Sequence, residues 1–255
     1  MLLAIDVGNT HTVLGIYKKE KLQSFWRIQT EREKTEDQYG IIVKNLLWYG
    51  NLESVEIKDI IVSSVVPPMT QTLKRMGIKY FDVKPIVVSS DLEIGIKNQY
   101  ENPGEVGADR IVNAIGGYEL YGGPLIIVDF GTATTFCAIS EDGSYIGGAI
   151  APGIYISTDA LFKLAAKLPK VELEKPDNVI GRNTTASMQA GIFYGFVGQV
   201  DGIVSKMIQE FYTEPTVIAT GGLANLIYKE SKTIERINPY LTLEGLKIIY
   251  NKNKR

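Results

Sequence analysis

Residues 2–17 read LLAIDVGNTHTVLGIY, and residues 124–140 read PLIIVDFGTATTFCAIS. Each stretch places apolar residues on both sides of a short polar turn that contains glycine, a pattern typical of a β-hairpin. The two stretches align at a fixed offset, which pairs Asp6 with Asp129, Gly8 with Gly131 and Thr12 with Thr135. Because the matched residues stand in the same strand-turn-strand context, the sequence predicts an internal duplication.

The segments after the two hairpins follow a common order. A third strand is predicted at KLQSFWRI in the first half and at SYIGGAIAPG in the second. The first half continues with a helix in TEREKTEDQYGIIVKNLLWYG, a buried strand at 58–66, a helix at MTQTLKRMG and a strand at PIVVSS. A loop at 91–110 then leads to the helix ADRIVNAIGGYELYG, and the second half adds a helix over 184–211, a strand at TVIATGG and a helix at LANLIYKE.

This order predicts an α/β protein of two duplicated βββαβαβ lobes that face a nucleotide cleft. The expected lobes are an N-terminal nucleotide-binding lobe at residues 1–120 and a C-terminal one at 121–255.

Composition narrows the class of protein. The chain of 255 residues is 45% hydrophobic and 22% charged, and its net charge of -2 argues against nucleic acid or an anionic membrane as partner. A single cysteine and a single histidine exclude an intrachain disulfide and a cysteine-based or multi-histidine metal cluster. The start MLLAIDVGN lacks the basic region of a signal peptide, and no apolar stretch reaches about 18 residues. A soluble, cytoplasmic protein is expected, with the basic end NKNKR as a solvated tail.

The hairpin turns suit phosphate binding. Glycine lets the backbone approach a ligand closely, while amide N–H groups and the Asn9 and Thr10 side chains can donate hydrogen bonds to phosphate oxygens. Asp6, at the end of the first strand, can hold Mg²⁺ directly or through water. The stretch TGG before LANLIYKE could supply the platform for adenine.

Asp109 in GADRIVNAIGG is the candidate base for an acceptor hydroxyl in phosphoryl transfer. The alternative is that Asp109 caps the helix that begins there or interacts favourably with its dipole. Arg110 could bind a substrate carboxylate through two hydrogen bonds, and its alternative is a surface salt bridge.

Five motifs together resemble a known family: DVGNTHT, YENPGEVGADR, DFGTATT, IGRNTT and TGGLA. Their order and spacing are similar to those of type III pantothenate kinases, and the resemblance covers nearly the whole chain. That family belongs to the acetate and sugar kinase, heat-shock and actin superfamily, so the resemblance implies an actin-like ATPase (ribonuclease H-like) fold. It also implies the reaction, in which ATP and pantothenate give 4′-phosphopantothenate in the first step of coenzyme A synthesis.

The resemblance also implies the role of each site residue. The residues implied in ATP binding are Asp6, Val7, Gly8, Asn9, Thr10, His11, Thr12, Val13 and Thr132. Those implied in pantothenate binding are Tyr100, Gly107, Ala108, Asp109, Arg110 and Thr184, with Asp109 as proton acceptor. Asp129 is implied as ligand of a monovalent cation, K⁺ or NH₄⁺, while Mg²⁺ accompanies ATP.

These implied roles have alternatives. Asp129 could serve only the hairpin, Thr184 or Thr185 could cap the long helix, and Tyr100 could be a packed surface aromatic. No catalytic role is expected for His11.

The helix after Thr184 carries a stripe of small residues at Gly191, Gly195, Gly198 and Gly202. The stripe could pack on its own sheet or form a subunit interface, and since the resembled family is dimeric a homodimer is favoured.

Two other functions compete: another kinase or phosphohydrolase of the superfamily, and a non-enzymatic regulatory relative. The presence of Asp6, Asp109 and Asp129 together favours an enzyme.

Overall fold

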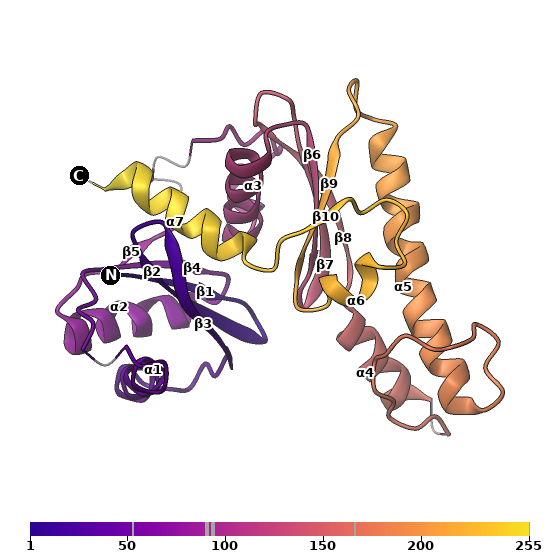
Figure 1. Ribbon diagram of the computed structural model, residues 1–255, viewed down its shortest axis with the longest axis horizontal. Helices are drawn as coiled ribbons and strands as arrows, with labels where there is room; N and C mark the ends of the chain where they lie inside the picture. The colour runs from indigo at the N-terminus through magenta and orange to yellow at the C-terminus, as the bar shows by residue number, and fades with distance from the viewer. Residues whose placement is uncertain (53, 90–91, 93–94, 166, 255) are drawn as a thin grey trace. The chain divides into compact units, whose positions relative to one another are not determined.

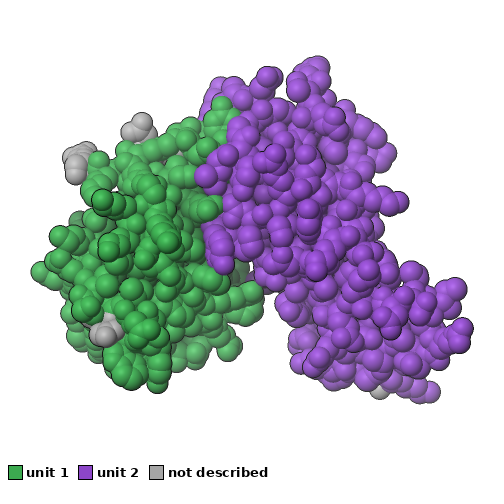
Figure 2. Space-filling view, viewed as in Figure 1, with its two compact units in different colours: residues 1–96, 102–119, 242–255 green, residues 97–101, 120–241 purple. Residues whose placement is uncertain are grey.

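The computed structural model describes residues 1–52, 54–89, 92, 95–165 and 167–254. The chain forms two compact units, coloured separately in Figure 2. The first comprises residues 1–96, 102–119 and 242–255, and the second comprises residues 97–101 and 120–241. No helix in the described ranges is both long enough and apolar enough to cross a membrane.

The first unit is built on a five-stranded mixed sheet with the order β3-β2-β1-β4-β5. Its strands are β1 (Leu2–Val7), β2 (His11–Lys18), β3 (Lys21–Gln29), β4 (Asp59–Ser64) and β5 (Ile86–Val87). The pairs β1–β2 and β2–β3 are antiparallel, while β1–β4 and β4–β5 are parallel. The helical segments are α1 (Glu36–Tyr49), α2 (Pro67–Phe81), the 3₁₀ turn η1 (Pro103–Glu105), α3 (Ala108–Tyr121) and α7 (Leu241–Asn253).

Strand alternation divides the residues of β1 between the two faces of this sheet. Leu3, Ile5 and Val7 pack into a core with α1 and α2. Asp6 therefore lies on the opposite face, which α3 and α7 cover in Figure 1. The sequence thus directs one carboxylate of β1 away from the main core.

The second unit repeats this topology. Its sheet has the order β10-β9-β6-β7-β8. Read from the opposite edge, this is the order of the first sheet with each strand replaced by its sequence counterpart. The elements are β6 (Leu125–Phe130), β7 (Ala133–Ile139), β8 (Tyr145–Pro152), α4 (Ile154–Leu164), α5 (Thr184–Ile208), β9 (Thr216–Gly221), α6 (Ala224–Tyr228) and β10 (Arg236–Ile237). Ile126, Val128 and Phe130 pack against α5, so Asp129 points to the other face. The predicted duplication and α/β class are confirmed.

The units differ from the predicted lobes 1–120 and 121–255 at Leu120, which belongs to the second unit, and in two longer segments. Residues 97–101 join the second unit because Lys97 and Gln99 form backbone hydrogen bonds with Tyr145 of β8. Residues 242–255 return to the first unit, where α7 packs on β2. A Cβ on Gly15 would lie 2.8 Å from Leu243 Cδ1, so the absence of a side chain at Gly15 lets that leucine pack closely on β2.

Several element boundaries also differ from expectation. Pro67 begins α2 instead of only ending the strand before it, which suits proline at the first helical turn. Helices α4 and α7 were not predicted, and α7 takes up most of the expected tail NKNKR. Ser90 of the predicted strand, residues 91, 93 and 94 of the predicted loop, and Arg255 of the tail lie outside the described residues.

Candidate active site

The turn of the first hairpin spans residues 8–11 and closes tightly. Gly8 N donates to His11 O at 3.0 Å, and a Cβ on Gly8 would lie 3.0 Å from that same oxygen. Asp6 stands just before the turn, opposite Val13 on β2 and Ser63 on β4. At the end of the central strand β1, the backbone atoms of Gly8 and His11 therefore lie close together, and the carboxylate of Asp6 lies beside them.

Thr12 and Thr30 brace this turn from within. Thr30 Oγ1 donates to Gly8 O at 2.8 Å and lies 2.9 Å from Thr12 Oγ1. Because the Thr30 proton goes to a carbonyl, which can only accept, Thr12 donates to Thr30. Thr12 and Val7 are each 1% exposed. These two members of the predicted ATP-binding stretch can therefore contribute only through the backbone.

Two arginines contact the exposed side of the turn. Arg27 Nη2 donates to His11 Nδ1 at 2.8 Å, and Arg32 Nη2 donates to Asn9 Oδ1 at 3.1 Å. Burial, and secondarily the Arg27 guanidinium, lower the pKa of His11. His11 is therefore neutral near pH 7, with its proton on Nε2.

The segment 107–110 begins α3 at the same edge of the first sheet. A Cβ on Gly107 would lie 3.5 Å from Val65 Cγ1, and Val65 N donates to Val7 O at 3.1 Å. Val65 thus connects the start of α3 with the end of β1. The start of α3, which carries Asp109, therefore lies at the edge of the sheet where the parallel strands β1 and β4 end.

Asp109 is half-buried in the first turn of α3, where its Oδ1 accepts a hydrogen bond from Arg110 N at 2.8 Å. Gly107 O accepts from Arg110 N and Ile111 N, so the backbone of Gly107 starts the helix. The Asp109 carboxylate also interacts favourably with the positive end of the helix dipole, which was the predicted alternative.

Arg110 is 8% exposed, which contradicts the alternative of a surface salt bridge. Its Nη2 lies 3.4 Å from Glu105 O, in the segment that precedes α3. The guanidinium is therefore buried, beside the segment that leads into α3.

In the second unit, Asp129 stands opposite Thr135 on β7 and Thr220 on β9. A Cβ on Gly221, which has φ +89°, would lie 2.5 Å from Asp129 Oδ1, so the carboxylate occupies the space above a bare glycine. Carboxylate and carbonyl oxygens at such a place suit a hard cation. Within the described ranges, no three or more His, Cys, Asp or Glu side chains group to hold a metal ion.

Tyr100 is fixed to β8 by its neighbours. Tyr145 N donates to Lys97 O and Gln99 N donates to Tyr145 O, both at 2.8 Å. The Tyr100 ring lies 6.2 Å from the buried Tyr145 ring, between centroids. Tyr100 is half-buried, so part of its ring remains open to a ligand.

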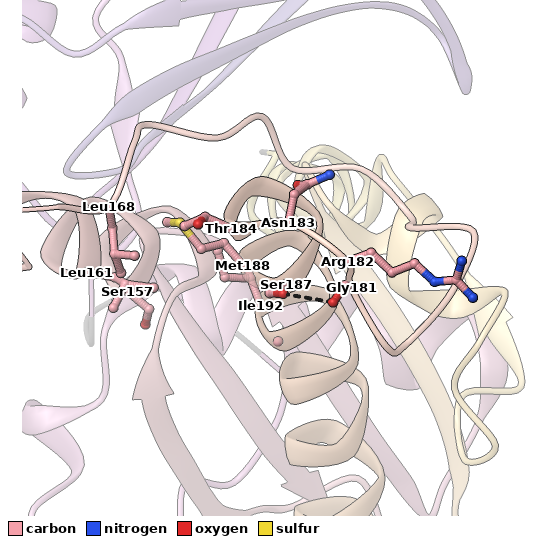
Figure 3. Close-up of a pocket in the computed structure, with 11 residues that line it drawn as sticks. Ser157, Leu161, Leu168, Gly181, Arg182, Asn183, Thr184, Ser187, Met188 and Ile192 are labelled. Atoms are coloured by element: carbon pink, nitrogen blue, oxygen red, sulfur yellow. Dashed lines mark hydrogen bonds between the residues drawn. The ribbon is translucent and has the colours of Figure 1, made fainter.

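Thr184 lines a pocket of about 800 Å³ between α4 and the start of α5 (Figure 3). Asn183 Oδ1 accepts from Ala186 N at 2.8 Å, so Asn183 caps α5, which contradicts the alternative in which Thr184 or Thr185 caps this helix. Ser187 Oγ donates to Gly181 O across the base of the pocket. Exposed Arg182 adds a cation to its lining.

Four residues that contact these turns and the start of α5 were not predicted from the sequence: Thr30, Arg27, Arg32 and Asn183. Thr30 lies 22 positions from Gly8, and only the register of β2 against β3, which pairs His11 with Gln29, brings the two together. That register follows from hairpin length and could have been inferred. Asn183 precedes an apolar helical run, which is an ordinary N-cap signal.

Comparison with known proteins identifies close relatives. Residues 2–206 match the family described as type III pantothenate kinase. The chain is 57% identical over 253 residues to a type III pantothenate kinase of Geobacillus kaustophilus, covering 99% of this chain and 98% of that protein. A type III pantothenate kinase of Bacillus cytotoxicus is 56% identical over 253 residues, covering 99% and 97%.

Solved structures share the fold at low identity. A Campylobacter jejuni protein assigned to the Baf family of transcriptional activators is 18% identical with a TM-score of 0.61, and the match covers 98% of each chain. The activator of 2-hydroxyisocaproyl-CoA dehydratase from Clostridium difficile, solved with bound ADPNP, is 15% identical with a TM-score of 0.50 over 96% of this chain and 91% of that one. At these identities the similarity is one of fold.

Proposed function

This chain belongs to the type III pantothenate kinase family, and we propose which of its residues carries out each part of the reaction. The protein is an ATP-dependent kinase that converts pantothenate to 4′-phosphopantothenate in coenzyme A biosynthesis. The main observation in support of these roles is that the carboxylate of Asp109 lies at the same edge of the first sheet as the glycine turn at residues 8–11, which suits phosphate binding.

The first hairpin binds the ATP phosphates. Gly8 permits a close backbone approach, with its own N–H donating to His11 O, and residues 9–11 supply backbone and side-chain donors. Thr132 is a further proposed contact of ATP. Asp6 would hold Mg²⁺, because Mg²⁺ is usually bound by one or two carboxylates plus substrate phosphates. Bound Mg²⁺ would neutralise charge on the phosphates during transfer.

Asp109 acts as general base. It accepts the proton of the pantothenate 4′-hydroxyl as that oxygen bonds to the γ-phosphorus of ATP. The bond from the γ-phosphorus to the bridging oxygen breaks, and ADP leaves with the electron pair. The Arg110 N–H that donates to Asp109 Oδ1 holds the carboxylate in one orientation for this step.

Pantothenate is bound by its carboxylate and along its amide chain. Buried Arg110 provides the charge that pairs with the carboxylate, since a guanidinium in a low-dielectric site binds it with two hydrogen bonds. Gly107 and Ala108 line the approach to Asp109, and Tyr100 and Thr184 add further contacts. Thr184 lines a pocket of the second unit that has both apolar and polar lining residues.

Asp129 is the proposed ligand of an activating K⁺ or NH₄⁺ ion. Its carboxylate lies above Gly221, where an oxygen-lined space suits a large monovalent cation. The reaction is placed in the cytoplasm because ATP is available there and the single thiol, Cys137, is compatible with a reducing compartment.

A homodimer through α5 is the proposed assembly. Gly191, Gly195, Gly198 and Gly202 are exposed, and a Cβ on each would meet nothing within 4 Å, so the stripe does not pack on its own sheet. Exposed apolar side chains lie nearby, on α4 and before α5: Tyr155, Ile156, Leu164, Val179 and Ile180. Such a surface is typical of a subunit interface.

The test of the mechanism is Asp109→Asn, which keeps the side-chain shape but removes the basic oxygen. We expect kcat for pantothenate to fall by about 10²- to 10⁴-fold, while ATP binding measured by calorimetry is retained. Asp82→Asn is the matched control, because Asp82 is exposed at the end of α2 in a left-handed conformation that asparagine also adopts.

Equal turnover in Asp109→Asn and the wild type would remove Asp109 as the base. Turnover of a sugar or another acid in preference to pantothenate would favour the competing kinase. ATP binding without any transfer would favour a regulatory relative.

A further inference from the structure

Three of the four backbone carbonyls of the first hairpin turn, residues 8–11, accept hydrogen bonds from the protein itself. Gly8 O accepts from Thr30 Oγ1 at 2.8 Å, and Thr10 O accepts from Thr30 N at 2.9 Å. His11 O accepts from Gly8 N at 3.0 Å. On the side chains, Asn9 Oδ1 and His11 Nδ1 accept from two arginines.

Almost all of these donors come from one short segment. Arg27 lies on β3, and Thr30 and Arg32 follow just beyond the end of that strand at Gln29. Thr30 is the central member because it binds both Gly8 and Thr10, and it also accepts from buried Thr12. We call residues 27–32 the polarity brace.

The chemistry of phosphate explains what such a brace would do. Phosphate oxygens at neutral pH chiefly accept hydrogen bonds, so a carbonyl or carboxamide oxygen that faced them would repel them. A turn whose acceptors are held from behind presents its N–H groups to the ligand instead.

The side chains of Asn9 and His11 are also held with their acceptor atoms bound to the protein. Because Arg32 holds Asn9 Oδ1, the other end of that amide, the NH₂ group, is free to turn toward a ligand. Because Arg27 can only donate, His11 Nδ1 accepts and the ring carries its proton on Nε2. Both contacts select the orientation in which the side chain acts as a donor.

We propose that Thr30, Arg27 and Arg32 are positioning residues that hold acceptors of the turn at residues 8–11 away from the ATP phosphates, so that its remaining donors face them. They act through the turn and not by touching the nucleotide. The proposal rests on the proposed binding of ATP phosphates by this turn.

The first test compares Thr30→Val with Thr30→Ser. Valine has the shape of threonine but leaves Gly8 O without its hydroxyl donor, whereas serine keeps that donor. We expect Thr30→Val to raise the Kd for ATP and the KM for ATP by about tenfold, with the KM for pantothenate unchanged and Thr30→Ser close to the wild type.

Thr72→Val is the matched control for this comparison. Thr72 is a buried threonine of α2 that donates to Pro68 O within its own helix, so its loss also removes a buried hydroxyl from the first unit. It should leave the Kd for ATP unchanged. If Thr30→Val binds ATP as tightly as the wild type, the polarity brace is overturned.

A double-mutant cycle tests whether Arg32 acts through Asn9. Arg32→Met should weaken ATP binding in the wild-type background and have no further effect in the Asn9→Ala background, because the amide that it orients is gone. Additive losses would mean that Arg32 acts on the nucleotide independently of Asn9 and would overturn its positioning role. This cycle stays informative even if Thr30→Val folds poorly.

The proposed function and the brace fail in different ways. If the wild type does not bind ATP, or if substitutions in residues 8–11 leave its binding intact, the assignment of this turn to ATP fails. If wild-type binding is normal and depends on the turn but not on residues 27–32, only the brace fails.

Discussion

At the scale of single residues, Asp129 gives a direct test of the cation proposal. Its carboxylate lies above Gly221, and a charged oxygen ligand holds a cation more strongly than a neutral one. We expect Na⁺ in place of K⁺ to lower kcat. Asp129→Asn should raise the K⁺ concentration that gives half-maximal activity by about tenfold.

Asp142→Asn is the control for this test, because Asp142 lies in the β7–β8 turn of the same unit and is bound by Ser140 and Ser144. Its K⁺ activation curve should match that of the wild type. An unchanged curve in Asp129→Asn would exclude Asp129 as a ligand of the cation.

Residue types that carry chemistry could be predicted from the sequence, but their environments could not. Glycine, aspartate and threonine in a repeated turn already indicated phosphate binding, because few other roles need that combination. The burial of Arg110 and Thr12, by contrast, depends on packing between segments distant in sequence. The site roles themselves remain predictions.

At the scale of elements, Asp201 joins α5 to the segment between α6 and β10. Its carboxylate accepts from Ser231 Oγ at 2.6 Å, from Thr233 Oγ1 at 2.9 Å and from Lys232 N at 3.1 Å. Asp201→Ala would leave these donors without their acceptor. We expect the free energy of unfolding to fall by about 2–4 kcal/mol, measured by urea titration.

The pH dependence of the same contact has a definite sign. Burial acts to raise the pKa of Asp201, but hydrogen bonds from Ser231, Lys232 and Thr233 outweigh it and hold the pKa below its usual value. The folded pKa thus lies below the unfolded one, about 3.9. The stabilisation is therefore complete above that value and is lost as the pH falls through the folded pKa.

The stability difference between the wild type and Asp201→Ala should accordingly be constant near neutral pH and should shrink below about pH 3.9. A difference that did not depend on pH would mean that the charge of Asp201 does not contribute. Ser205→Ala, an exposed change one helical turn further along α5, should leave the stability nearly unchanged.

A buried stripe along a helix made that helix predictable from the sequence in most cases, with α7 as the exception. Helix α1 was recognised from Tyr39, Val43 and Leu47, which the structure buries. Helix α4 buries only Ile154, so it offers no such stripe within one chain. Helix α7 does carry an apolar pattern in Leu246, Ile249 and Tyr250, which the interpretation as a tail overlooked.

At the scale of the whole molecule, duplication could be predicted because both copies keep the hairpin that begins each sheet. The return of α7 to the first unit could not be predicted from order along the chain. It depends on Gly15 and Gly245, which leave room for Leu243 and for the Val112 backbone respectively. Such long-range packing is encoded in side-chain volume and not in local pattern.

The homodimer is the last prediction at this scale. In a two-fold symmetric interface the same surface meets itself, so the glycine stripe of α5 would face the stripe of a second copy at close backbone distance. A double variant, Gly195→Leu with Gly198→Leu, would hold the two helices apart. The folded chain has room for both side chains, because a Cβ at either position meets nothing within 4 Å.

We expect the wild type to show twice the chain mass of 28.2 kDa by light scattering and the double variant to show that mass once. Helix content by circular dichroism should be unchanged, since leucine is a better helix former than glycine. Asn45→Leu, at an exposed position on α1, is the control and should remain dimeric. A wild-type monomer, or a double variant that keeps the dimer mass, would exclude this interface, because close backbone approach requires residues without large side chains along the stripe.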